Sequence, residues 1–211
     1  ITIRGDEKIM GIKKFSFIKP RMRNYIHEWL FHELAGEGDL IKLKYEFINL
    51  KLNGNNYGLY VLEEGFDKDL IERNKRRNGP IFSITDEFDN NIFDSKLEVY
   101  NKNYWNKKEN FQLSNYARNR LKNFLDGKND LEDVFDTEKW AWYIALADLT
   151  YAHHGLTGRN VKHYYNPVSS LFEPVPYDGH RVLKNFNKNL INFDHKNAFE
   201  KASECLNAKK S

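Results

Sequence analysis

The sequence predicts an α+β fold, and three observations support this. Short runs of alternating polar and apolar residues fill the first third of the chain, on both sides of one amphipathic segment. A stretch near residue 140 is apolar on nearly every face of a helix. A short β-hairpin then lies between Asn160 and Asp178.

Composition limits the classes of protein to consider. With 211 residues, 40% of them hydrophobic, the chain can bury a core as one domain over residues 1–211. The net charge of +3 gives no reason to expect a nucleic-acid partner. No run approaches the roughly 18 consecutive apolar residues of a membrane-spanning helix. The single Cys205 excludes an internal disulfide. The chain starts at Ile1 within an apparent strand, so we interpret it as truncated at the N-terminus.

The first third of the chain is expected to hold a strand and then a helix. Residues Ile12–Ile18 alternate as a strand does and carry Lys13 and Lys14. A helix is predicted from Arg21 to Leu34, with Glu28 at the edge of its apolar face. That face comprises Ile26, Trp29, Leu30 and Leu34, and Gly36 is placed to end the helix.

The next segments are a predicted hairpin, a connector and an insertion. The stretch "FINLKLNGNNYGLYVLEE" alternates on both sides of an Asn-Gly turn, so it predicts a hairpin that ends at Glu63 and Glu64. Residues 67–77 predict a solvated helix with a basic run. Residues 86–136 are polar, and we interpret them as an irregular insertion with a helix near residues 114–124.

Thr137 offers an N-cap to "EKWAWYIALADL", which predicts the most buried helix of the molecule. Asp148 ends that apolar stretch. Because an unpaired buried carboxylate is costly, Asp148 should lie near the helix end, in an ion pair or in a cleft.

The hairpin between Asn160 and Asp178 is expected to bring these two side chains together at its open end. A carboxylate and an amide oxygen are hard ligands of the kind that Mg²⁺ accepts alongside substrate phosphates. The alternative is that Asn160 caps a turn and that Asp178 is a solvated loop carboxylate.

The order of these elements matches the protein-kinase plan, in which a strand Lys pairs with a helix Glu, and a loop Asn and a later Asp hold Mg²⁺. The stretches "KKFSF", "RNYIHEWLFHEL", "LNGNNYGLYVLEE", "RNVKHYYNP" and "FEPVPYDGH" together resemble the CotH kinase-like family of spore-coat and related bacterial proteins. The resemblance runs from about Ile9 to about His180.

This resemblance implies a bilobal protein-kinase-like fold and transfer of phosphate from ATP, with Mg²⁺ or Mn²⁺, to a protein Ser or Thr. Asn160 and Asp178 match the metal-binding residues of the family. Lys13 or Lys14 would contact phosphate, with Glu28 as the partner of that lysine. Because adjacent strand residues point to opposite faces, the choice between Lys13 and Lys14 stays open. The alternative for both lysines and for Glu28 is ordinary surface charge.

The resemblance also implies how the chain divides. Residues 1–64 would form a small lobe and residues 65–211 a larger one. Glu63 and Glu64 fall at the transition between them, so the backbone nearby would face the adenine ring.

The sequence departs from the family at the catalytic base. Kinases place an Asp five residues before the metal-binding Asn, but Gly155 stands there in this chain. Candidates for the base are His154, one residue earlier, and Asp148 at the end of the buried helix. A hydrogen-bonded loop histidine is the alternative for His154.

A second departure is "YDGH" in place of the "WDxD" pattern of many relatives, which puts a histidine where a second acidic group would stand. A zinc site is not expected, because adjacent histidines present two ligands less easily than histidines one helical turn apart. The histidines considered for zinc are His153, His154, His163, His180 and His195.

Three functions remain open from the sequence. The first is the ATP-dependent phosphotransferase that acts on a protein substrate. The second is a nucleotide-binding pseudokinase that has lost the base. The third is a structural coat or surface protein that binds other proteins. The resemblance suggests the bacterial cell surface, secretion or the spore coat as the location.

Overall fold

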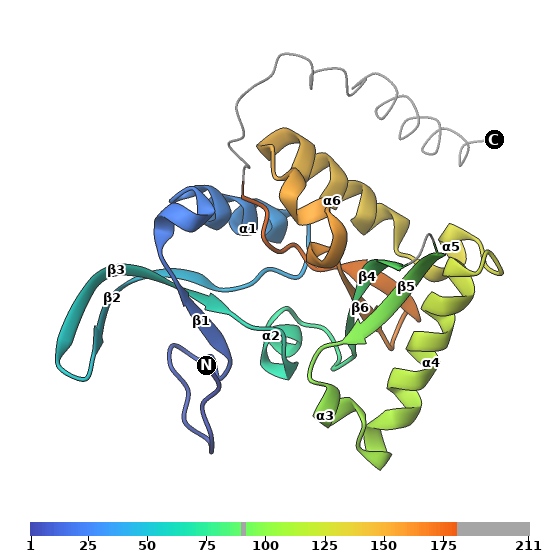
Figure 1. Cartoon of the computed structure of the whole chain (residues 1–211), viewed down its shortest axis with the longest axis horizontal. Coiled ribbons are helices and arrows are strands. Elements are labelled where there is room, and N and C mark those ends of the chain that lie inside the picture. The colour runs from blue at the N-terminus through green and yellow to red at the C-terminus, as the bar shows by residue number, and fades with distance from the viewer. Residues whose placement is uncertain (90–91, 181–211) are drawn as a thin grey trace. The chain divides into compact units, whose positions relative to one another are not determined.

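A computed structural model describes residues 1–89 and 92–180, and the side chains of 85–96 are not described. These residues combine helices with two antiparallel sheets (Figure 1), which confirms the predicted α+β class. His195 and Cys205 lie outside the described residues. Among the described residues, no helix is long and apolar enough to cross a membrane.

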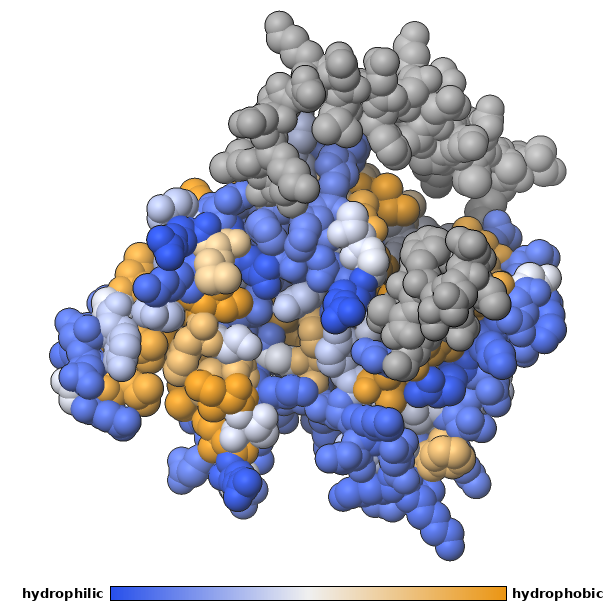
Figure 2. Space-filling view, viewed as in Figure 1, coloured by the Kyte–Doolittle hydropathy of each residue, from blue (hydrophilic) through white to orange (hydrophobic). Residues whose placement is uncertain are grey.

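The first sheet has the strand order β1-β3-β2 and contains the predicted asparagine-glycine hairpin. Its strands are β1 (Phe15–Ile18), β2 (Tyr45–Leu52) and β3 (Asn55–Glu64). Asn53 and Gly54 form the turn, both with positive φ. Strand β1 is shorter than predicted, because Lys14 forms only an isolated bridge with Thr2. The hairpin exposes Phe47, Leu52, Tyr57 and Leu59, and Figure 2 shows hydrophobic surface over it.

The helical segment after β1 differs from the prediction in its start and its end. It begins as a 3₁₀ turn, η1 (Pro20–Arg23), and continues as α1 (His27–Glu37). Asn24 and Tyr25 between them have φ of 53° and 59°, which an α-helix does not allow. Gly36 lies inside α1 and does not end it.

The buried face of α1 was also predicted wrongly. Ile26 is 64% exposed, and Trp29 and Leu30 are exposed too, whereas Glu28 is 0% exposed. Helix α1 packs through Phe31 and Ala35 against α6, and this orientation turns Glu28 and His32 into the interior.

Helix α6 (Thr137–Thr150) is less buried than the sequence suggests. Its N-cap is Asp136, whose Oδ1 accepts a hydrogen bond from the Lys139 amide at 3.1 Å, and not Thr137. Tyr143, Leu146 and Ala147 pack towards α1, beside which α6 lies in Figure 1. The other faces expose Trp142, Ile144 and Leu149. Two short 3₁₀ turns, η2 (His153–Leu156) and η3 (Gly158–Asn160), follow.

The second sheet has the strand order β5-β4-β6-β7 and corrects the prediction of an irregular insertion. Its strands are β4 (Ile81–Asp89), β5 (Ile92–Val99), β6 (Lys162–Asn166) and β7 (Leu171–Pro174). The helices after β5 are α3 (Lys102–Trp105), α4 (Lys108–Leu125) and α5 (Leu131–Val134). Ala117 and Leu121 of α4 pack against Phe82 of β4 and Phe172 of β7.

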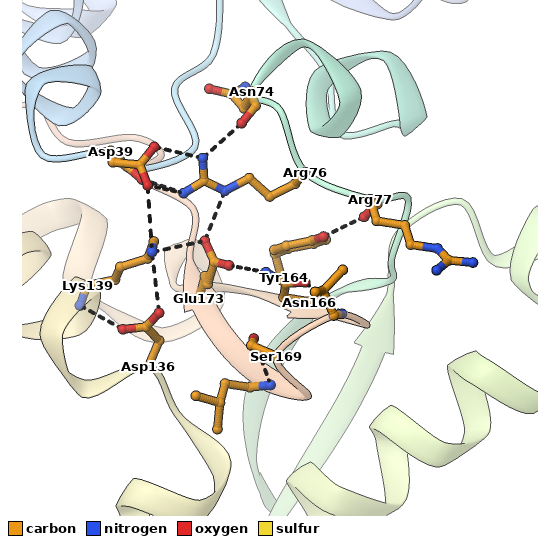
Figure 3. A network of polar contacts seen from close by, with 12 residues as sticks. Asp39, Asn74, Arg76, Arg77, Asp136, Lys139, Tyr164, Asn166, Ser169 and Glu173 are labelled. Carbon is orange, nitrogen blue, oxygen red and sulfur yellow. Dashed lines mark hydrogen bonds and ion pairs between the residues drawn. The ribbon is translucent and has the colours of Figure 1, made fainter.

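The segment predicted as a solvated helix with a basic run contributes to the interior. Helix α2 (Lys68–Arg73) buries Leu70 and Ile71. Beyond it, the Arg76 guanidinium binds both carboxylate oxygens of Asp39 at 2.8 and 2.9 Å and Glu173 at 3.2 Å (Figure 3). Lys139 Nζ lies 3.7 Å from Asp39 Oδ2 and 4.0 Å from Glu173 Oε2. This network ties the end of α1 to β7 and to the start of α6.

Replacement of Arg76 by Ala should therefore lower the free energy of unfolding by about 3 kcal/mol, since it leaves the buried Glu173 carboxylate without its nearest cation. Urea unfolding followed by circular dichroism measures the change. Arg77→Ala is the matched control, because Arg77 is exposed and its side chain points away from the network in Figure 3. An equal and small effect of both substitutions would contradict the structural role of Arg76.

Candidate functional site

The β6–β7 hairpin places Asn160 and Asp178 on either side of one histidine. Asn160 ends η3 just before β6, and Asp178 lies four residues after Pro174 at the end of β7. The Asn160 Nδ2 atom lies 3.2 Å from His154 Nδ1, and the same Nδ1 atom lies 3.3 Å from Asp178 Oδ2. The two side chains therefore converge on His154, to which Asn160 turns its amide nitrogen and not the oxygen that a metal would need.

Asp178 is the centre of this cluster and is nearly buried. Its φ of 55° is uncommon for a residue other than glycine, and such conformations concentrate at functional sites. The carboxylate forms an ion pair with Arg23 and lies 2.6 Å from His180 Nδ1. Its backbone carbonyl contacts His154 Nδ1 at 3.1 Å.

Arg23 is a site residue that sequence analysis missed. It comes from η1, and its Nε atom lies 3.8 Å from Oε1 of Glu63 at the end of β3. Its Nη1 atom lies 3.3 Å from His180 Nδ1. Nothing in the sequence pattern separates Arg23 from Arg21, because its partners Glu63, Asp178 and His180 are all distant in the sequence.

Glu63 and Glu64 both face inward at the end of β3. Burial raises the pKa of Glu63 to about 7, although Arg23 acts in the opposite direction. Glu64 accepts a hydrogen bond from the Lys44 amide at 2.8 Å and pairs with Arg73. Burial also raises the pKa of Glu64.

Glu28 is bound by partners other than the expected lysine. Its Oε1 atom accepts a hydrogen bond from the Gly179 amide at 3.1 Å and lies 3.4 Å from His32 Nε2. Burial alone would raise the pKa of Glu28, but His32, Arg23 and the Gly179 amide hold it below its usual value. A lysine–Glu28 ion pair is therefore absent from the described residues, and Arg23 is the cation nearby.

Lys13 and Lys14 line one cleft of about 490 Å³, together with Phe66 and Tyr100. Their ammonium groups have different partners, because Lys13 Nζ donates to the Gly5 carbonyl at 2.9 Å. Lys14 Nζ donates to Asn101 Oδ1 at 2.8 Å and to the Phe66 carbonyl at 3.3 Å. The segment that follows Glu63 and Glu64 thus forms a wall of this cleft.

Lys162 is a second residue that sequence analysis missed. Its Nζ atom is buried against three rings, at 4.9 Å from the Tyr177 centroid, 5.3 Å from Tyr100 and 5.6 Å from Phe66. It donates a hydrogen bond to the Arg159 carbonyl. Burial, and then Arg159, lower the pKa of Lys162 to about 8. A cation thus lies behind two aromatic walls of the cleft.

Gly155, at the expected base position, is packed too tightly for a side chain. A Cβ atom there would lie 2.8 Å from the Tyr177 carbonyl oxygen and 3.0 Å from the Tyr143 hydroxyl. That hydroxyl donates a hydrogen bond to the Gly155 carbonyl at 2.9 Å. A carboxylate is therefore excluded from this position by packing as well as by sequence.

The two candidate bases lie in different surroundings. Asp148 Oδ1, at the end of α6, lies 3.0 Å from His153 Nε2, and both side chains are partly exposed. His154 contacts Asp178 and Asn160 and is about one third exposed. Burial, and then His180 and Arg23, lower the pKa of His154.

The histidines are arranged differently from the expectation that argued against a zinc site. His153 turns to Asp148, but the rings of His154 and His180 lie 4.5 Å apart. Among the described residues, His154, Asp178 and His180 offer three possible ligand atoms within 4.8 Å of one another. His163 is buried elsewhere, and burial lowers its pKa to about 3.

The packing at Gly155 predicts a cost for any side chain. Gly155→Ala should lower the free energy of unfolding by about 1–3 kcal/mol, because the Tyr177 backbone must move. Thermal and urea unfolding measure this. His153→Ala, in the same 3₁₀ turn but exposed, should stay within about 0.5 kcal/mol. A fully tolerated Gly155→Ala would show that the loop is not packed as described.

The raised pKa of Glu63 predicts a pH dependence of stability. The contribution of protonated Glu63 is fully present below the unfolded-state pKa and is lost as pH rises through about 7. Relative to the parent, Glu63→Gln should therefore gain about 3 kcal/mol in free energy of unfolding between about pH 4.5 and pH 7. Urea unfolding at several pH values measures the difference. Parallel pH profiles would contradict it.

Comparison with known proteins agrees with the predicted resemblance. Residues 4–209 match the family model described as CotH kinase protein. A curated relative, inner spore coat protein H of Bacillus subtilis (strain 168), is 26% identical over 168 residues, which cover 74% of this chain and 45% of the relative. The chain thus spans less than half the length of that relative. Because the family model matches nearly the whole chain, the chain belongs to the CotH kinase protein family.

Proposed function

We propose that the protein is an ATP- and divalent-metal-dependent phosphotransferase that acts on Ser or Thr of a protein substrate. The observation that carries the proposal is the convergence of Asn160, Asp178, His154 and Arg23 at one point. A carboxylate and an amide that can hold a metal ion stand there beside a guanidinium that can bind phosphate. Family membership supports the same reaction class.

In this proposal a nucleotide would extend from the cleft towards Asp178 along two packed aromatic rings. The Phe66 ring lines the cleft and packs against Tyr177, with the ring centroids 5.1 Å apart, and Tyr177 directly precedes Asp178. In our proposal the aromatic walls hold the base. Lys14 and Lys13 supply donors for the phosphates at the cleft.

The residues at Asp178 fit a metal-bound triphosphate. Asp178 and Asn160 would hold the metal ion, which would neutralise charge that develops on the transferred group. Arg23 would bind a phosphate oxygen once it leaves the carboxylate. Glu28 acts as a positioning residue, because its bond to the Gly179 amide fixes the backbone next to Asp178.

The proposal includes a bilobal, kinase-like division of the chain. Residues 1–64 hold the first sheet with η1 and α1, and this part would be the small lobe. The remainder, from residue 65, would be the larger lobe. Arg23, Glu28 and Glu63 come from the first part, whereas Asn160 and Asp178 come from the second.

Proton transfer from the substrate hydroxyl is assigned to His154 or Asp148. His154 is the better candidate by position, since it touches both Asn160 and Asp178. Asp148 is the better candidate by chemistry, since it is a carboxylate paired with an imidazole. Because phosphoryl transfer depends mainly on positioning and electrostatic stabilisation, the lack of an Asp at Gly155 does not exclude activity.

A pseudokinase or a coat-assembly protein is the second candidate, and two observations favour it. Arg23 pairs with the carboxylate that a metal would need, and packing at Gly155 excludes the usual base. The relative's name, inner spore coat protein H, makes the spore coat the proposed location and coat proteins the proposed partners for either function.

Nucleotide binding tests the proposal first. Asp178→Asn keeps the size of the side chain and removes its charge, so binding of ATP in the presence of Mg²⁺ or Mn²⁺ should weaken at least about tenfold. Asn160→Ala should act in the same direction with a smaller effect. Isothermal titration calorimetry measures both. Asp126→Asn, a surface carboxylate paired with Lys128, is the control. Equal affinity of Asp178→Asn and the parent would remove Asp178 from the site.

Single-turnover phosphate transfer at saturating metal and ATP tests the base. Loss of a general base costs about a hundred- to ten-thousand-fold in rate. Asp148→Asn and His154→Gln are to be compared separately, and a large loss in one of them, with ATP affinity retained, identifies the base. Tight nucleotide binding without transfer to any protein by the parent would favour the pseudokinase.

A further inference from the structure

We infer that His154, Asp178 and His180 form a binding site for a first-row divalent transition-metal ion, of the class of Mn²⁺, Co²⁺ and Zn²⁺, in preference to Mg²⁺. The inference rests on the proposed function and makes it more specific, because it names the metal ion that Asp178 would hold. It follows from residues of this chain that depart from the family pattern, above all His180.

The three side chains lie close enough together to share one metal ion. His154 Nδ1 lies 3.3 Å from Asp178 Oδ2, and His180 Nδ1 lies 2.6 Å from Asp178 Oδ1. Metal–ligand distances of about 2.0–2.1 Å in a tetrahedral site place neighbouring ligand atoms about 3.3 Å apart. Both imidazoles thus present Nδ1 to one carboxylate. The His154 contact already matches this spacing, whereas the His180 contact must lengthen and His154 Nδ1 must release the Asp178 carbonyl at 3.1 Å to admit an ion.

The chemistry of the ligands determines which ion fits. Mg²⁺ prefers oxygen ligands and retains several waters, whereas imidazole suits first-row transition metals. Two histidines and one carboxylate form the ligand set of several zinc and iron enzymes, in which further positions stay open. His154 and His180 are partly exposed, so a water or a phosphate oxygen can reach the remaining positions.

Arg23 is the obvious competitor, and the structure offers it a second partner. The guanidinium now pairs with Asp178, but its Nε atom already lies 3.8 Å from Glu63 Oε1. That buried carboxylate oxygen has no hydrogen-bond donor. A shift of Arg23 to Glu63 would therefore release Asp178 to the ion and satisfy a second buried acid.

The assignment also distinguishes the two candidate bases. A histidine whose Nδ1 atom binds a metal cannot use that atom to accept a proton. His154 then belongs to the metal site, and Asp148 with His153 remains to accept the substrate proton.

Cobalt binding to the 211-residue chain without nucleotide tests the inference. Titration with Co²⁺ at pH 7.5 should give one equivalent bound, with visible absorption bands of a nitrogen- and oxygen-ligated ion. About a hundredfold excess of Mg²⁺ should leave those bands in place. His154→Asn and His180→Asn should each weaken Co²⁺ binding about tenfold or more. His153→Asn, a neighbouring histidine outside the cluster, should bind as the parent does.

His180→Asp is the variant that tests selectivity. It replaces an imidazole by a carboxylate, so affinity for Mg²⁺ should rise and affinity for Co²⁺ should fall. Circular dichroism and thermal unfolding show that each variant is folded, and Co²⁺ should raise the melting temperature of the parent.

Failure of the parent to bind Co²⁺ would overturn the inference, as would binding that His154→Asn and His180→Asn leave unchanged. Displacement of Co²⁺ by the excess of Mg²⁺ would overturn it too. These outcomes are separate from the proposed function. Binding of ATP with Mg²⁺ despite no Co²⁺ site would leave the phosphotransferase standing, and a Co²⁺ site without any ATP binding would remove the phosphotransferase alone.

Discussion

The ion pair between Arg23 and Asp178 is the contact on which the candidate site depends. It joins the 3₁₀ turn after β1 to the segment after β7, and both groups are largely withdrawn from water. A charge in such a place needs a partner, because an isolated buried ion is costly. Arg23 is that partner in this structure. A ligand that binds Asp178 must therefore also give Arg23 a new environment.

The residues around this pair are arranged to permit such an exchange. Glu63 lies on the other side of Arg23 and is buried without a hydrogen-bond donor at one oxygen. Glu28 fixes the Gly179 amide, and a Cβ atom at Gly179 would lie 2.3 Å from the Phe31 ring. This hydrogen bond and this packing hold the backbone next to Asp178, while Arg23 has two carboxylates within reach.

The sequence predicted what depends on local pattern. The Asn53-Gly54 turn and the hairpin between Asn160 and Asp178 were recognisable because alternation and turn residues are local signals. The hairpin connection alone was enough to place Asn160 near Asp178. The buried face of α1 was not predictable in the same way, because it carries Glu28 and His32, and only tertiary contacts decide that these polar residues point inward.

Arg23, Lys162 and the pairing of His154 with His180 had no local signal. Each is defined by partners distant in the sequence, such as Arg23 with Asp178, or by rings from three separate segments around Lys162. The histidines illustrate the reason most clearly. Adjacency of His153 and His154 argued against zinc, but the fold turns these neighbours to different partners and brings His180 to His154.

A crystal structure of the protein with a non-hydrolysable ATP analogue and Mn²⁺ tests the central claim most directly. The account predicts an anomalous peak for Mn²⁺ at about 2.0–2.3 Å from an Asp178 oxygen, the phosphates beside it, and the Arg23 guanidinium moved from Asp178 to Glu63 or a phosphate. Arg23 still paired with Asp178, with nucleotide and metal bound elsewhere or not at all, would contradict the account.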